Sequence, residues 1–143
     1  MHQAPFVRGD LPVVNKSYQP LDLFLFSAAT WNAHRVHYDQ EYSVQVEGHQ
    51  NLLVHGPLQA VEMYQVLIDA LVDGASIRAV DYRHLQALHV GEEVAITGRL
   101  TAVDERTGSA TFEMWVERAA DRQRTTTGTA TVQLGPRLSG SNT

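Results

Sequence analysis

The clearest pattern along the chain is a helical spacing of apolar residues in its middle. Pro57 suits a first helical position and Gly74 suits a helix end. Between them, apolar side chains recur at three- and four-residue steps: Leu58, Val61, Tyr64, Leu67, Ile68 and Leu71. Because Met63 and Val66 widen this apolar face, the sequence predicts one long helix that is buried on most of its sides.

The second half of the chain changes to a period of two, which is typical of strands. Apolar and polar residues alternate over residues 94–101 and again over residues 110–117. Residues 104–108, Asp-Glu-Arg-Thr-Gly, lie between these segments and predict a hairpin turn. Residues 77–85 and the threonine-rich residues 125–134 predict two further strands.

The first third of the chain is less regular. Residues 1–18 contain two prolines and a glycine and predict an extended lead-in, in which residues 11–14 form a short edge strand. Residues 21–29 are almost continuously apolar and follow Pro20, so they predict a short buried helix. The charged segment after this helix has no clean period and predicts a loop as far as Gly48.

The order of these elements indicates the fold. One long helix followed by about four antiparallel strands is an α+β order, in which the sheet wraps the helix. That arrangement is the hot-dog fold. We expect residues 1–18 to form the lead-in, residues 19–134 a single hot-dog domain, and residues 135–143 a disordered tail.

Composition narrows the classes of function. With 143 residues, of which 43% are hydrophobic and 19% charged, the chain reads as one ordinary globular domain. A net charge of −5 and the lack of a basic run argue against a nucleic-acid surface. No cysteine is present, which excludes disulfides and thiolate chemistry. Residues 1–10 do not resemble a secretory signal and no apolar run spans a membrane, so we expect a cytoplasmic protein.

Two segments carry the candidate chemistry. Residues 32–39 place two histidines, an arginine, an asparagine and an aspartate within eight positions. Residues 54–58, Val-His-Gly-Pro-Leu, then start the long helix. An imidazole changes its charge near neutral pH, and a helix N-terminus offers free N–H groups to a developing negative charge. A base beside such an oxyanion site predicts proton-transfer chemistry on a carbonyl compound.

These segments resemble a known family. The chain is similar to the single-domain hot-dog hydratases and dehydratases of the MaoC type over roughly residues 19–134. The nearest subgroup is that of mesaconyl-CoA hydratase and the mitochondrial 3-hydroxyacyl-thioester dehydratase. The resemblance is carried by residues 26–39 (FSAATWNAHRVHYD), residues 54–58 (VHGPL), and Tyr82-Arg83 leading to residues 90–92 (VGE).

The broad family places an acid–base pair in the motif Asp-x-Asn-Pro-x-His. Here His37 matches the histidine, whereas Asn32 stands at the aspartate position. His34 and Arg35 stand at the asparagine and proline positions. The subgroup's own pattern, Asn-x-His-Arg-(Ile/Val)-His-Tyr-Asp, is matched in full by residues 32–39. An amide cannot exchange a proton as a carboxylate does, so the sequence does not identify the second proton-transfer group.

The resemblance implies a hydro-lyase that adds water to a 2-enoyl thioester or removes it from the 3-hydroxyacyl form. Coenzyme A or acyl carrier protein would carry the acyl group in fatty acid or polyketide metabolism, and no further cofactor is implied. The implied catalytic residues are His37, Asn32, His34 and Gly56. The implied substrate-binding residues are Arg35, His55 and Arg83.

Each of these residues also has a purely structural alternative. Gly56 can serve only as a helix cap, and Asn32 only as a loop-capping amide. Arg35 can form an ion pair with Asp39 or Glu41, and Arg83 a cross-strand ion pair. The side chain of His55 can point into the core.

Metal binding is not expected. No helix places the three histidines of the two segments on one face, and cysteine ligands are absent. The remaining histidines show no pattern of partners and are expected to be surface or packing residues: His2, His49, His84 and His89.

Two other functions fit the same fold. A hot-dog thioesterase would use a carboxylate near the helix, either Asp39 or Glu62, to activate water. A non-catalytic hot-dog subunit would pair with an active one. Under any of the three functions, a hot-dog domain exposes a long strand edge, so we expect a dimer with a continuous sheet and a site at the interface.

Overall fold

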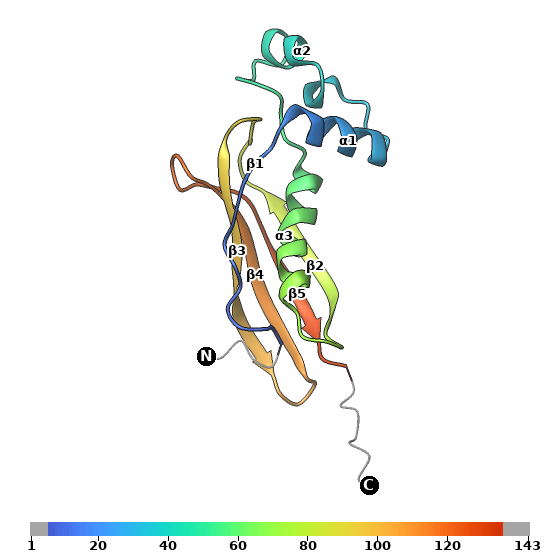
Figure 1. Ribbon diagram of the computed structural model, residues 1–143, viewed down its shortest axis with the longest axis vertical. Coiled ribbons are helices and arrows are strands. Elements are labelled where there is room, and N and C mark those ends of the chain that lie inside the picture. The colour runs from blue at the N-terminus through green and yellow to red at the C-terminus, as the bar shows by residue number, and fades with distance from the viewer. Residues whose placement is uncertain (1–5, 136–143) are drawn as a thin grey trace.

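The computed structural model describes residues 6–135. In this range the elements are β1 (Val14–Ser17), α1 (Pro20–Thr30), the 3-10 helix η1 (Arg35–His37), α2 (Gln40–Gln45), α3 (Gly56–Ala70), β2 (Ser76–His84), β3 (Glu93–Asp104), β4 (Ser109–Arg118) and β5 (Arg124–Gln133). The helix α3 runs along one face of the sheet, while α1, η1 and α2 gather at one end of the molecule (Figure 1). The predicted α+β class is confirmed.

The sheet is antiparallel throughout, with the strand order β1-β3-β4-β5-β2. The predicted hairpin joins β3 to β4, and the Asp104 carboxylate accepts a hydrogen bond from the Arg106 N–H at 3.0 Å in this turn. β2 pairs with β5 on one side and forms an edge of the sheet on the other. This edge is nine residues long, against four for β1 at the opposite edge.

The core lies between α3 and the sheet face that it covers. Burial alternates strictly along β4, as the period of two predicts, and the sheet contributes Ile96, Phe112, Met114, Val116, Ala130 and Val132. The helix contributes Leu58, Met63, Tyr64, Val66 and Leu67. Full burial of each large side chain of this kind stabilises the fold by about 1.5–3 kcal/mol.

Eight of the fifteen residues of α3 are buried, but two members of the predicted apolar stripe are not. Val61 is 57% exposed and Ile68 is 49% exposed, although both belong to the predicted apolar stripe. The helix also ends at Ala70, because Leu71 is extended and Gly74 lies in a following turn at φ 83°. One side of α3 is therefore uncovered, and the apolar Val61 and Ile68 lie on it together with the polar Gln65 and Asp69.

The lead-in contributes to the core more than its composition predicts. Phe6 and Val7 are buried, and Val7 forms an antiparallel bridge with Leu71 at the end of α3. The predicted edge strand exists but lies at Val14–Ser17 instead of residues 11–14, in register with β3. The predicted tail lies outside the described residues except for Gly135.

The loop predicted between α1 and Gly48 is also wrong, since this segment holds η1 and α2. The Asp39 carboxylate accepts a hydrogen bond from the Tyr42 N–H at 3.1 Å and so caps α2. Helices of three and six residues are too short to give a readable hydrophobic period, which explains the error. Among residues 6–135, no helix combines the length and apolarity needed to cross a bilayer.

Candidate active site

His37 lies at the end of η1 and is 8% exposed. Its Nδ1 lies 2.7 Å from the Leu53 carbonyl oxygen, which can only accept a hydrogen bond. The proton of the neutral ring is therefore on Nδ1, and Nε2 carries a free lone pair. Burial lowers the pKa of His37, so the ring is neutral at neutral pH and can accept a proton.

His55 is stacked on His37. The two ring centroids are 3.7 Å apart at an angle of 18°, and His55 is only 1% exposed. Its Nε2 forms a hydrogen bond of 2.7 Å with the hydroxyl of Ser27 on α1. Burial, and then the charge that His37 would carry, lower the pKa of His55 to about 4. The alternative that the His55 side chain points into the protein is thus correct. In this buried position the ring also contacts His37, the candidate base.

Gly56 follows His55 directly and begins α3. The first backbone hydrogen bond of this helix is donated by the Gln59 N–H to the His55 carbonyl oxygen, at 3.3 Å. Pro57 has no N–H. Within the described residues, the amides of Gly56 and Leu58 therefore have no backbone acceptor, as expected of a first helical turn. These two donors and the helix dipole favour a negative charge at this end.

His84, at the end of β2, lies against Gly56. A Cβ atom on residue 56 would stand 2.0 Å from Nε2 of His84, so only glycine fits beside this imidazole. Nδ1 of His84 lies 3.2 Å from the hydroxyl oxygen of Thr126 on β5. Burial lowers the pKa of His84. The expectation that His84 is a surface or packing residue therefore misses its position at the helix N-terminus.

Asn32 and His34 are used by the loop itself. The Asn32 side-chain oxygen accepts a hydrogen bond from the His34 N–H at 3.1 Å, and Nδ1 of His34 accepts one from the Val36 N–H at 3.2 Å. Both side chains are exposed. Asn32 thus acts as the loop-capping amide that was its structural alternative, while the ring centroid of His34 lies 5.8 Å from that of His37.

Arg35 has partners within the same segment. Its guanidinium donates two hydrogen bonds to one carboxylate oxygen of Asp39, at 3.1 and 2.9 Å, and covers the ring of Tyr42 at 4.3 Å. The ion pair with Asp39, which was one alternative, is therefore present. The structure does not bring Arg35 into contact with the stacked histidines, and its role toward a substrate stays a prediction.

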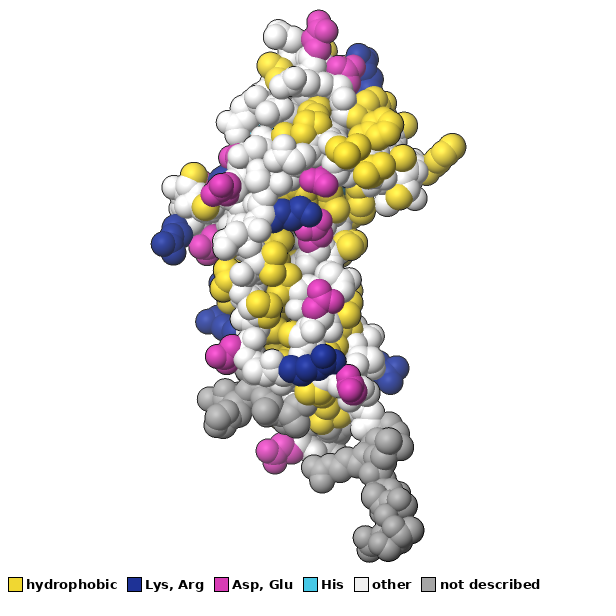
Figure 2. All heavy atoms as spheres, in the orientation of Figure 1, with side chains coloured by type: hydrophobic (Ala, Val, Ile, Leu, Met, Phe, Trp, Pro, Cys, Tyr) yellow, Lys and Arg dark blue, Asp and Glu magenta, His cyan; other side chains and the backbone are white. Residues whose placement is uncertain are grey.

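A groove of about 320 Å³ opens beside the buried pair. It is lined by Phe24, Ser27, Ala28, Trp31, Asn32, Ala33 and Tyr38, so most of its wall is apolar. Hydrophobic side chains also gather on the surface over α1 (Figure 2). Ser27 belongs both to this groove and to the hydrogen bond with His55, so it joins the surface to the histidines.

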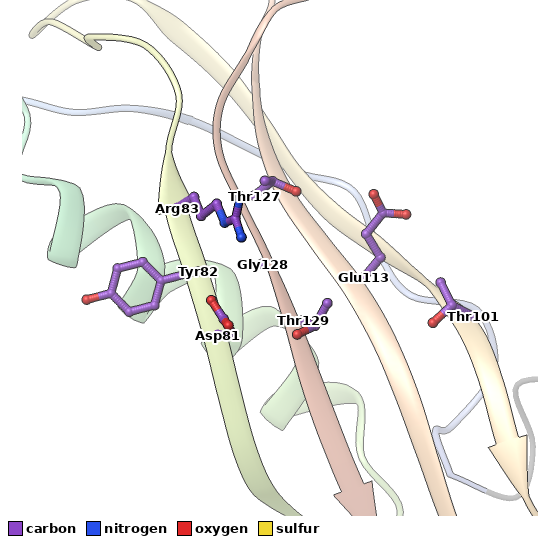
Figure 3. A pocket seen from close by; sticks show the side chains of 8 residues that line it. All are labelled: Asp81, Tyr82, Arg83, Thr101, Glu113, Thr127, Gly128 and Thr129. Carbon is purple, nitrogen blue, oxygen red and sulfur yellow. The ribbon is translucent and has the colours of Figure 1, made fainter.

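Arg83 lies on the other face of the sheet. Tyr82 and His84 point toward α3, whereas Arg83 lines a separate hollow of about 350 Å³ over β5 and β4. Figure 3 shows Arg83 extending over β5 toward Thr127, while Tyr82 extends the opposite way. The structure therefore separates Arg83 from the candidate base, and a role toward coenzyme A phosphates stays a prediction.

Ser27 and His84 are the members of the site that the sequence did not single out. For Ser27, the available signal was a lone serine inside the apolar run of residues 21–29. For His84 the sequence held no signal, because its neighbour Gly56 is distant in the sequence. Over the part of the chain that the structure describes, no cluster of three or more His, Cys, Asp or Glu side chains is arranged to hold a metal ion.

Residues 10–90, which include this whole site, match the family described as hydroxyacyl-thioester dehydratase type 2. The chain is similar to mesaconyl-C(4)-CoA hydratase of Chloroflexus aurantiacus, with 53% identity over 47 residues, or 33% of this chain and 17% of the relative. It is also similar to the mitochondrial hydroxyacyl-thioester dehydratase type 2 of Saccharomyces cerevisiae, with 28% identity over 100 residues. That match covers 70% of this chain and 34% of the relative. The chain thus matches only a minor part of either relative.

The fold has close counterparts among solved structures. An (R)-hydratase from A. caviae, involved in PHA biosynthesis, superposes with a TM-score of 0.79 at 20% identity. The match covers 93% of this chain and 99% of the hydratase, which confirms the predicted hot-dog fold. The chain belongs to the hydroxyacyl-thioester dehydratase type 2 family and has the hot-dog fold.

Proposed function

We propose that this chain hydrates 2-enoyl thioesters and dehydrates 3-hydroxyacyl thioesters, with coenzyme A or acyl carrier protein as the carrier. One observation carries the proposal. A neutral His37 with a free Nε2 is stacked on His55, the residue that immediately precedes the free amides of the α3 N-terminus. A proton acceptor and an oxyanion site are thus held together by buried contacts.

The chemistry follows from the needs of the reaction. In hydration, the water oxygen bonds to the β-carbon, and the electron pair of the double bond moves toward the thioester carbonyl oxygen. The amides of Gly56 and Leu58 stabilise the resulting enolate, an effect worth roughly 3 kcal/mol for one such donor. The water proton passes to Nε2 of His37 and then to the α-carbon, which restores the carbonyl and the neutral imidazole.

The groove beside α1 suits the acyl chain. Its largely apolar walls favour an apolar acyl group, and Ser27, one of its polar lining residues, connects the groove to the histidine pair through its hydrogen bond with His55. Arg35, the one Lys or Arg among residues 19–58, is already paired with Asp39. We therefore propose aliphatic enoyl thioesters as preferred substrates over dicarboxylic ones.

The thioesterase alternative has less support. Its two candidate carboxylates both form ion pairs, Asp39 with Arg35 and Glu62 with Lys16 of β1. At Asp39, hydrogen bonds from the Tyr42 N–H and from Arg35 lower the pKa of the carboxyl group, which disfavours water activation there.

A panel of enoyl thioesters of increasing chain length, followed by mass spectrometry, tests the proposal. We expect the gain of one water on an enoyl thioester, and its loss from the 3-hydroxyacyl form. His37→Ala should abolish this turnover and keep the fold. Release of free thiol from a saturated acyl thioester, without hydration, would establish the thioesterase instead. If the chain alone is inactive and a second hot-dog subunit restores turnover, it is the non-catalytic partner.

We also propose a homodimer, in which the β2 edges of two copies pair. The β2 edge is long and lies beside the uncovered side of α3, where the apolar Val61 and Ile68 are exposed. Exposed apolar side chains next to an unpaired strand edge favour association with another copy. Since His84 and Gly56 lie at the end of this edge, the proposed interface runs beside the proposed site.

A further inference from the structure

The histidine at the end of β2 has no function in the mechanism above. β2 ends beside the start of α3 (Figure 1), and this brings the His84 imidazole onto Gly56, whose missing Cβ makes room for the ring. The ring atom nearest to that space is Nε2. The Cβ position lies 2.0, 2.2 and 2.4 Å from Nε2, Cε1 and Cδ2, so the ring face of His84 near Nε2 covers Gly56, the residue after the His55 that stacks on His37.

The partners of His84 fix which nitrogen carries the proton. The Thr126 hydroxyl donates a hydrogen bond of 3.0 Å to the side-chain oxygen of Gln59, so toward His84 it can only accept. Nδ1 of the neutral His84 therefore carries the proton and donates it to Thr126, at 3.2 Å. Among residues 6–135, Nε2 then has no hydrogen-bond donor and is a free acceptor beside Gly56. A lowered pKa keeps the ring neutral and agrees with this assignment.

Asn32 is poorly placed for the same role. Its side-chain oxygen already accepts the His34 N–H, and it is held within the loop. His84, in contrast, has an unoccupied acceptor at the helix that would hold the enolate.

We propose that His84, and not Asn32, is the second group that contacts the reacting water, a proposal that rests on the hydratase function. Nε2 of His84 accepts one O–H of the water, while Nε2 of His37 takes the proton of the other O–H. The oxygen bonds to the β-carbon, and the proton on His37 moves to the α-carbon. The O–H held by His84 stays intact and becomes the 3-hydroxyl of the product, and in dehydration the same contact steadies the leaving hydroxyl.

Two substitutions of similar size separate this role from packing. His84→Phe keeps an aromatic ring against Gly56 but has no acceptor, whereas His84→Gln supplies an amide oxygen that accepts a hydrogen bond. We expect His84→Phe to lower kcat about 100-fold with little change in KM, and His84→Gln to retain at least about a tenth of the wild-type kcat. If Phe retains as much kcat as Gln or more, the ring only packs and the proposal is overturned.

A second pair of variants tests the tautomer. Thr125 and Thr126 both donate to the side-chain oxygen of Gln59, at 2.7 and 3.0 Å, but only Thr126 contacts His84. Thr126→Val should lower kcat at least about fivefold, because one hydrogen bond that orients the ring is lost. Thr125→Val should stay near wild type once both proteins are shown to be folded at the assay temperature. Equal losses in the two variants would contradict the proposal.

The outcomes distinguish this inference from the function on which it rests. If the wild-type chain does not hydrate any enoyl thioester, the proposed function fails. If the wild type is active and depends on His37, but His84→Phe has the wild-type kcat, only the role of His84 fails.

Discussion

The imidazole rings of His37 and His55 are stacked with their centroids 3.7 Å apart. A positive charge on one ring therefore disfavours a charge on the other. Burial also lowers the pKa of both histidines. His55 is the more deeply buried, and its lowered pKa would keep it neutral when His37 accepts a proton in the proposed reaction. The stack thus supports a base that is ready to accept a proton at neutral pH.

The stack predicts a stability that falls in acid. The pKa of His55 is about 4 in the folded chain and about 6.5 in an unfolded one, so below pH 6.5 the unfolded chain binds more protons. The stabilisation is complete above the unfolded value and is lost as the pH falls toward 4. It amounts to roughly 3 kcal/mol over this range of pH. We expect a clearly lower Tm at pH 5 than at pH 7.5 in thermal unfolding.

His55→Gln provides the control for this pH dependence. The carboxylates of the chain titrate in both proteins, so their contribution cancels in the comparison. The drop in Tm between pH 7.5 and pH 5 should be smaller in the variant. An identical drop would show that His55 does not cause it.

Ser27 is expected to hold the stack in place. In Ser27→Ala, both ring nitrogens of the buried His55 lack a protein partner within the described residues, which should lower the free energy of unfolding by about 1–3 kcal/mol. Turnover should also fall, because His37 loses its fixed neighbour. Ser43→Ala is a matched control, since Ser43 is also a buried serine but donates to the Asn51 carbonyl. It should lose stability without a specific loss of kcat; a similar kcat loss in both variants would count against the role of Ser27.

Gly56→Ala should affect activity more than stability. The new Cβ would collide with the imidazole of His84, which is an exposed side chain and can rotate away at a small cost in energy. Alanine also favours the helix over glycine by up to about 1 kcal/mol. We expect a near-normal Tm in calorimetry and a kcat reduced at least about tenfold.

Gly98→Ala offers the opposite case. There a Cβ would meet the backbone carbonyl oxygen of Glu113 at 2.4 Å and the Met114 sulfur at 2.2 Å, and the backbone cannot rotate away. This variant should unfold at a lower temperature. A Gly56→Ala protein with full activity would show that the position of His84 is not needed.

The uncovered side of α3 predicts self-association. We expect a dimer in light scattering at micromolar concentration, and Val61→Lys should shift it toward monomer because the lysine charge would be buried at the interface. Val46→Lys is the control, because Val46 is also exposed and apolar but caps α2 at the far end. An active wild-type monomer would rule out the proposed dimer and a site that requires it.

Much of the fold could be predicted from periodicity. The spacing from Leu58 to Leu71 found α3, and the alternation of the second half found β3 and β4. The short helices of residues 35–45 were missed, because they are stabilised by side-chain caps and one ion pair and have no apolar stripe. The exposure of Val61 and Ile68 was missed as well. Hydrophobic periodicity marks apolar positions but does not show which of them are buried in the core and which are exposed to solvent.

The site was predictable only in part. His37, His55 and Gly56 were named from adjacent motifs, and the structure brings these three together. Asn32 and Arg35 lie in the same motif, but their polar groups are bound within the loop. His84 reaches Gly56 only because β2 runs antiparallel to β5 at the sheet edge and ends at the start of α3, a relationship that no local pattern contains.

The buried Nδ1 of His55 implies a conflict between thermal stability and catalytic activity. Within residues 6–135, Nδ1 of His55 is buried and has no hydrogen-bond partner, which costs the fold about 1–3 kcal/mol. An apolar side chain of similar size would remove that cost, and with it the ring that faces His37. An apolar replacement of this histidine that raises the Tm should therefore also lower the turnover of substrate.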